Sequence, residues 1–167
     1  MELAANTKVA FEWKVSLERG GVVLWAERIK NIIPTEGLDH LLGVTLKGSA
    51  QHATWYIGVF EGNYTPAAGA TAANIVVNAT ESTAYEEASR PTWVGGTVSG
   101  GVVSNADSPA VFTFNATKTI YGGFLVSSLT KGGSAGSLLS VVRFSTAKAM
   151  EAGDILRITA GITAVSA

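Results

Sequence analysis

The motif in this sequence with the clearest chemical precedent is GGSAG at residues 132–136, which has the G-x-S-x-G spacing of a serine nucleophile elbow. In hydrolases this motif joins a strand to a helix, and a histidine follows the serine along the chain. Here the flanking segments GGFLVSSL and SLLSVVRFS are both typical of strands, and no histidine follows Ser134. The pattern therefore predicts a hairpin turn and no catalytic residue.

The other ionisable residues that could do chemistry are few and scattered. His40 and His52 are the only histidines, the chain has no cysteine, and no H-x-x-x-H spacing occurs. Glu86 and Glu87 lie close to Arg90 in the sequence, a pattern typical of solvated or ion-paired surface. Asp154 follows a glycine and is expected to cap a turn before the last strand. We expect no catalytic residue, no metal and no cofactor.

The aromatic residues raise the alternative of a glycan-binding surface, in which exposed rings stack against sugars. They are numerous enough to form one, with Trp93 and Tyr64 as the anchors of that alternative. In residues 53–60, however, Trp55 and Ile57 fall on one face of a strand while Tyr56 falls on the other. A strand that is apolar on both faces is predicted to be central and buried, and to run into an exposed loop at residues 61–64.

The N-terminal region must form a different element, because its hydrophobic residues alternate. Residues 8–17 place valine, phenylalanine, tryptophan and leucine on one face and mostly polar residues on the other, which predicts a half-buried strand. The glycine pair at 20–21 predicts a turn, and residues 22–33 return as a second strand or, alternatively, form a helix. We predict that residues 1–33 are a hairpin arm for assembly.

The remainder of the chain, residues 34–167, is predicted to form the main domain. Residues 35–43 indicate a short helix with Thr35 as its N-cap and Gly43 as its end. The acidic segment 80–91 fits a loop or one helical turn. Short apolar runs separated by glycine-rich turns predict roughly eight strands, at residues 53–60, 73–77, 92–98, 101–104, 110–115, 119–127, 137–144 and 154–165. The fold class is therefore mainly β, an antiparallel β-sandwich or jelly roll.

Composition argues for contact with other proteins. The 167 residues carry 12 basic and 13 acidic side chains, and residues 1–50 carry six of each, so neither part supplies a basic field for nucleic acid. Charged residues make up only 15% of the chain and the mean hydropathy is +0.27, which indicates that neighbours cover part of the surface. The N-terminal residues lack the pattern of a signal peptide, and we expect no membrane contact.

Several blocks in a fixed order carry a resemblance. They are WYIGV at 55–59, STAYEEASRPTW at 82–93, AVFTFNATKTIYGGFLVSS at 110–128 and AGDIL at 152–156. In this order the chain resembles small virion proteins of tailed bacteriophages over about residues 29–160. The resemblance implies a β-sandwich building block of the particle, which decorates the capsid or lies on the tail or fibre.

These observations together predict a non-enzymatic virion structural protein, assembled in the host cytoplasm. We expect a minor capsid or decoration protein that stabilises the head through the major capsid protein, as a homotrimer. The alternatives are a tail, fibre or baseplate protein, or a glycan-binding receptor module. The predicted interface residues are Phe11, Trp13, Val15, Trp25, Ile29 and Tyr64.

Overall fold

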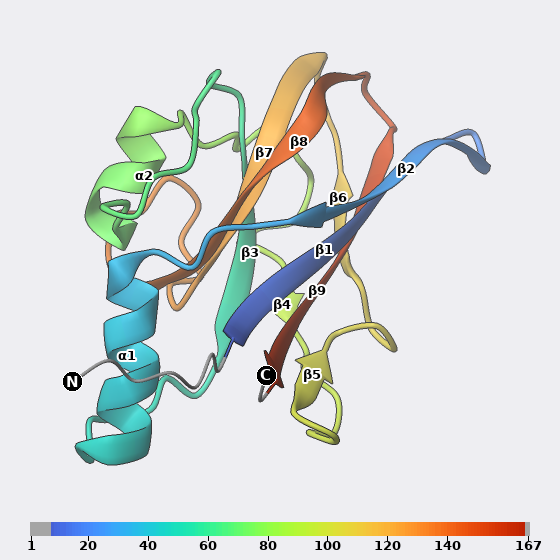
Figure 1. Cartoon of the computed structure of the whole chain (residues 1–167). Helices are drawn as coiled ribbons and strands as arrows, with labels where there is room; N and C mark the ends of the chain where they lie inside the picture. Colours follow the sequence, from blue (N-terminus) through green and yellow to red (C-terminus); the bar gives the residue numbers. More distant parts are fainter. Residues whose placement is uncertain (1–7, 166–167) are drawn as a thin grey trace.

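The computed structural model, which describes residues 8–165, is a mainly β structure built from two antiparallel sheets and two helices. Figure 1 shows the sheets packed face to face, with both helices on the flank opposite the β1–β2 turn. The mainly β, sandwich-type fold predicted from the sequence is confirmed. The elements are β1 (Lys8–Arg19), β2 (Val22–Lys30), α1 (Thr35–Leu46), β3 (Trp55–Phe60), α2 (Ala72–Asn78), β4 (Thr92–Trp93), β5 (Val102–Ser104), β6 (Ala110–Thr113), β7 (Lys118–Val126), β8 (Leu138–Met150) and β9 (Ile155–Val165).

The first sheet has the strand order β2-β1-β9-β5, and β6 also pairs with β9. Its hairpin between β1 and β2 turns at Gly20 and Gly21, whose φ angles of 56° and 80° lie in the region that favours glycine. Of the residues 22–33 predicted as a strand or a helix, Val22–Lys30 form strand β2, so the strand is confirmed over this shorter range. β1 lies inside the sheet, because it pairs with β2 on one side and with β9 along its whole length on the other.

The second sheet has the order β4-β3-β7-β8 and is apolar on both faces. Ile57 and Val59 of β3 pack into the core between the sheets, while Phe60 packs into a second cluster with Ile75 of α2. The prediction of a central strand with two apolar faces is confirmed, and α2 covers part of the second face. Trp55, at the start of β3, is only partly buried.

The core between the sheets takes its largest side chain from β1. Trp13 is fully buried, and its indole Nε1 donates a hydrogen bond to Ser140 Oγ of β8 at 2.9 Å. One residue therefore joins the two sheets both by packing and by a satisfied polar contact. A buried indole N–H without an acceptor would destabilise the fold, and the Ser140 hydroxyl supplies that acceptor.

Three local predictions are wrong in whole or in part. The strand predicted over residues 92–98 forms only at Thr92–Trp93. Residues 73–77 form most of α2, although their Ile-Val-Val run indicated a strand, because Thr71 and Asn74 form a reciprocal capping box that begins a helix. The helix expected over 35–43 continues to Leu46, and Thr35 is its first residue, with no side-chain cap. Pro34 occupies the N-cap position.

Candidate functional site

Three of the six predicted interface residues lie in the core. Phe11, Trp13 and Val15 have exposed fractions of 2%, 0% and 0%, because their face of β1 is turned toward the second sheet. The prediction that they form an exposed interface is wrong for these three. A boundary at residue 33 also does not separate two packed units, since β1 belongs to the sandwich.

The other three predicted interface residues are half-buried and do not share a surface. Trp25 and Ile29 of β2 pack against the edge of the central core, where the Lys148 ammonium lies 4.1 Å from the centre of the Trp25 ring. Tyr64 packs edge-on against Phe60, in the cluster beneath α2. Tyr64 and Trp93 therefore do not form one glycan site, because Trp93 packs against the central core.

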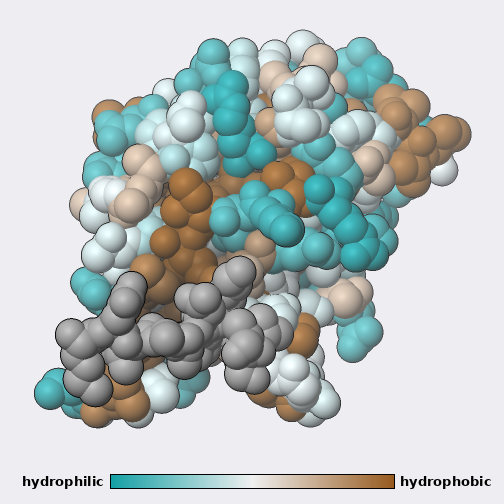
Figure 2. Space-filling model, viewed as in Figure 1, coloured by the Kyte–Doolittle hydropathy of each residue, from teal (hydrophilic) through white to brown (hydrophobic). Residues whose placement is uncertain are grey.

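The turn of the β1–β2 hairpin carries the most exposed aliphatic run of the described chain. Val22, Val23 and Leu24 have exposed fractions of 61%, 59% and 53%. Figure 1 shows the turn projecting beyond the sheets, and Figure 2 shows a hydrophobic patch in the same place. Val22 and Val23 pair with the end of β1, and β1 in turn pairs with β9, so the apolar tip is held in a fixed position on the sandwich. We call residues 22–24 the hairpin tip.

Helix α1 carries a second exposed apolar row. Leu38, Leu42 and Leu46 recur every four residues, so they lie on one face of the helix, and each is exposed. The helix is anchored elsewhere through Glu36. One oxygen of this carboxylate accepts hydrogen bonds from the Leu138 backbone N–H at 2.7 Å and from the Ala72 N–H at 2.8 Å.

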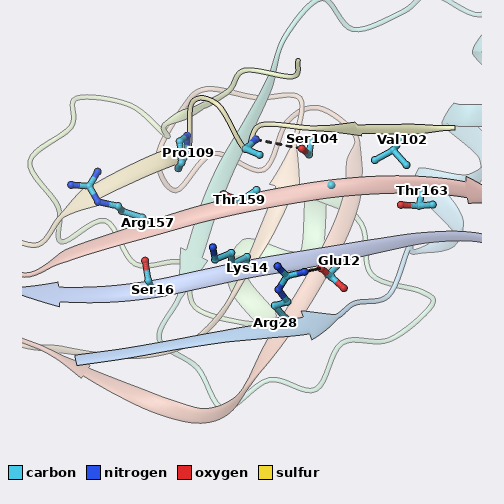
Figure 3. Close-up of a pocket in the computed structure, with 12 residues that line it drawn as sticks. Glu12, Lys14, Ser16, Arg28, Val102, Ser104, Pro109, Arg157, Thr159 and Thr163 are labelled. Carbon is cyan, nitrogen blue, oxygen red and sulfur yellow. Dashed lines mark hydrogen bonds and ion pairs between the residues drawn. The ribbon is translucent and has the colours of Figure 1, made fainter. Parts of the chain in front are cut away.

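A groove of about 570 Å³ lies on the outer face of the first sheet. Figure 3 shows its lining side chains on β1, β9, β2 and β5, with Lys14 and Arg28 close to its middle. The lining mixes polar and apolar groups, and its charged members are three cations, Lys14, Arg28 and Arg157, and one carboxylate, Glu12. The sequence indicated an even charge balance over each part of the chain. The sequence could not show that the pairing of β1 with β2 and β9 brings these cations together on one face.

A second cleft, of about 480 Å³, lies where the two sheets part at one end of the sandwich. Trp55 and Trp93, which are direct partners on β3 and β4, line it together with Val103 of β5 and His52. The Trp93 Nε1 donates to the Ala160 carbonyl at 2.8 Å, which fixes the indole between the sheets. We call this the aromatic cleft. A cleft with two half-buried indoles suits the apolar face of a flat ligand.

The two histidines meet beside the aromatic cleft. Their rings are stacked 4.6 Å apart, each lies edge-on to Trp55, and His52 Nε2 is 2.9 Å from Ser137 Oγ. Burial lowers the pKa of His40 below 6.5, and the charge of neighbouring His52 lowers this pKa further. No residue spacing indicated this contact, because it forms only when the segment before β3 folds back against α1. Among the described residues, no three metal-ligating side chains gather around a common point.

The GGSAG segment joins β7 to β8, as the predicted turn requires, and Ser134 is exposed within it. The turn is held by a buried ion pair whose arginine, Arg90, was predicted to lie at the surface. Arg90 donates to both carboxylate oxygens of Glu81 at 2.7 Å and to the Gly133 carbonyl at 2.8 Å. The exposed fractions of the two charged side chains are 0% and 1%, so the surface prediction for Arg90 is wrong.

Asp154 is also more than a turn cap. It accepts a hydrogen bond from the Glu151 N–H, as a cap does, but it also forms a two-point ion pair with Arg19 at 2.7 Å. The Arg19 hydrogen bonds hold the pKa of Asp154 below its usual value. This pair fastens the end of β1 to the turn before β9.

No protein-family model matches the chain, and no curated protein sequence matches it. Neither described helix has the length and apolar composition needed to cross a membrane.

Proposed function

We propose that this chain is a non-enzymatic structural protein of a bacteriophage particle, a minor capsid or decoration protein that stabilises the head by binding the major capsid protein. The ordered sequence blocks that resemble small virion proteins support this proposal. The observation that carries it is the hairpin tip, where three aliphatic side chains project from a rigid strand pair. Exposed apolar groups held in this way are typical of a contact site.

The hairpin tip alone is a modest contact. Val22, Val23 and Leu24 are a little more than half exposed, so covering them contributes on the order of 1 kcal/mol each. Such a contact becomes firm when several copies bind the same particle together, because the second and third contacts form at high effective concentration. We therefore propose that the chain acts as a homotrimer with three hairpin tips directed at the shell.

Attachment of a tip variant to phage particles tests this proposal. In the variant, Val23→Ser and Leu24→Ser are combined. A matched control combines Val77→Ser on α2 with Val98→Ser, two positions that are 76% and 71% exposed away from the hairpin. We expect the tip variant to keep its thermal unfolding temperature and to fall at least tenfold in copies per purified particle. The proposal is wrong if the tip variant attaches as well as the control.

A second candidate function is glycan binding, which the aromatic cleft favours. Trp55 and Trp93 line one hollow, with Thr54, Thr92 and Gln51 at its rim as hydrogen-bonding groups. Titration with host surface polysaccharide, followed by tryptophan fluorescence, separates the two functions when compared with binding to empty capsids. Saturable binding to polysaccharide that Trp93→Ala abolishes, without binding to capsids, would favour the glycan function.

A further inference from the structure

We infer that the groove on the outer face of the first sheet is a docking site for an extended acidic peptide segment of a partner protein. This inference concerns a different face from the hairpin tip, and it does not depend on where the protein lies in a particle. It is carried by the shape of the groove, by the charges that line it and by the polar groups along its floor.

The groove has the shape of a trough. β1 and β9 form its floor, Arg28 of β2 stands on one side, and β5 with the loop to Pro109 forms the other side (Figure 3). Gly161 leaves the floor open in the middle of β9, and a side chain there would press on Ser104, since a Cβ atom would lie 3.0 Å from the Ser104 Cβ. From Arg157 to Thr163 the floor measures about 20 Å at ~3.3 Å per residue, the length of about six extended residues.

The charges of the groove are unbalanced. Lys14 and Arg28 are direct cross-strand partners of the same sign, an arrangement that destabilises a sheet unless an anion lies between them. The Glu12 carboxylate forms an ion pair with the Arg28 guanidinium at 3.1 Å, and the Glu18 carboxylate forms one with the Arg157 guanidinium at 3.4 Å. Across residues 8–165, no carboxylate pairs with Lys14. The lining therefore holds a surplus of positive charge in a chain whose net charge is −1.

An acidic peptide fits these features better than other anions. A single phosphate would occupy a small part of a trough of about 570 Å³. A nucleic acid needs a longer basic field than three cations with one carboxylate provide. An extended peptide can place carboxylates against Lys14 and Arg28 while the hydroxyl groups of Ser16 and Thr159 bond its backbone.

Nuclear magnetic resonance titration of the full chain, labelled with ¹⁵N, tests the inference, with hexaglutamate as the probe and hexaserine as the neutral reference. We expect saturable shift changes confined to β1, β9, β5 and the loop to Pro109, seen with hexaglutamate alone. Because the attraction is electrostatic, the affinity should fall when sodium chloride is raised from about 50 mM to about 500 mM.

Charge-reversal variants locate the site. Lys14→Glu should weaken hexaglutamate binding at least tenfold, whereas Lys47→Glu, which makes the same charge change at an exposed position after α1, should leave the affinity unchanged. Equal loss in the two variants would overturn the inference, as would shift changes scattered over the surface. The inference also fails if inorganic phosphate produces the same changes at equal charge, or if hexathymidylate binds more tightly than hexaglutamate.

Discussion

At the scale of single residues, the buried pair of Arg90 and Glu81 ties together segments that are distant in sequence. Besides the carboxylate, Arg90 bonds the carbonyls of Ser128 and Gly133, and Glu81 also accepts from the Gly132 N–H. The segment before β4 is thus fastened to the start and to the middle of the connection between β7 and β8. The GGSAG turn is ordered by charge and hydrogen bonding from outside itself.

Removal of the Arg90 side chain should therefore lower the stability of the folded protein strongly. Arg90→Ala leaves Glu81 charged, buried and unpaired, and we expect a loss of about 3–5 kcal/mol in the free energy of unfolding, measured by urea denaturation. Arg28→Ala, which breaks an exposed pair with Glu12, is the control and should cost less than about 1 kcal/mol. Similar losses in the two variants would show that the Arg90 pair is not buried.

The stacked histidines predict a dependence of stability on pH. Because the pKa of His40 is lowered in the folded protein, the unfolded chain binds a proton first as the pH falls below 6.5. The free energy of unfolding should therefore be highest above pH 6.5 and decrease from there toward the lower folded pKa. The lowered pKa of Asp154 affects the free energy of unfolding only in more acidic solution, where this carboxylate takes up a proton.

Urea unfolding at pH 7.5 and pH 5.5 measures this effect. We expect the wild-type chain to be less stable at pH 5.5, and the difference to shrink in His40→Gln, which cannot take up the proton. An equal difference in both chains would assign the pH dependence to other groups.

At the scale of elements, β1 is the strand on which the sandwich depends. It lies between β2 and β9, and it supplies Phe11, Trp13, Val15 and Leu17 to the core. A separable arm would have an apolar face that lies outside the core, whereas the apolar face of β1 lies inside it. For contact with another protein this region therefore offers the hairpin tip, the edge of β2 and the outer face of β1, which forms part of the groove.

Deletion of residues 1–33 should consequently abolish folding. We expect the truncated chain to lose its cooperative thermal transition in circular dichroism, because β9 loses a partner along its length. A finer comparison uses Phe11→Ala, expected to cost about 3–5 kcal/mol, and Val22→Ala at the exposed tip, expected to cost less than about 0.5 kcal/mol. A truncated chain that still melts cooperatively would instead support the prediction that residues 1–33 form an arm separate from the sandwich.

The sequence predicted those elements whose pattern is local. Alternation identified β1, and the two apolar faces of residues 53–60 identified a central strand. The strand over 73–77 was wrong because the β-branched run outweighed the capping residues Thr71 and Asn74, the one local signal that favoured a helix. The sequence could not show that Phe11, Trp13 and Val15 would be covered by this chain's own second sheet.

The candidate sites were less predictable than the fold, because each is made by side chains from distant segments. The groove joins Lys14 to Arg157 across paired strands, and the aromatic cleft joins His52 to Trp93. No spacing along the chain encodes these contacts. Arg90 was misplaced for a related reason, since its acceptors at Ser128 and Gly133 lie in a turn far along the sequence.

At the scale of the whole molecule, the surface is divided between different kinds of contact. The apolar hairpin tip lies at one extremity, with the helices on the opposite flank (Figure 1), while the basic groove occupies the outer face of the first sheet (Figure 3). A protein of low charge with such separated surfaces can contact more than one neighbour at once. This arrangement suits a subunit of a repeating assembly.

We propose that this sandwich binds the shell of a phage head through its hairpin tip. Cryo-electron microscopy of native particles tests it most directly, because the sandwich can be fitted into the density as a rigid body. We predict density for the chain on the outside of the head, with residues 22–24 touching the major capsid protein. Density on the tail, or a hairpin tip directed away from the shell, would contradict this account.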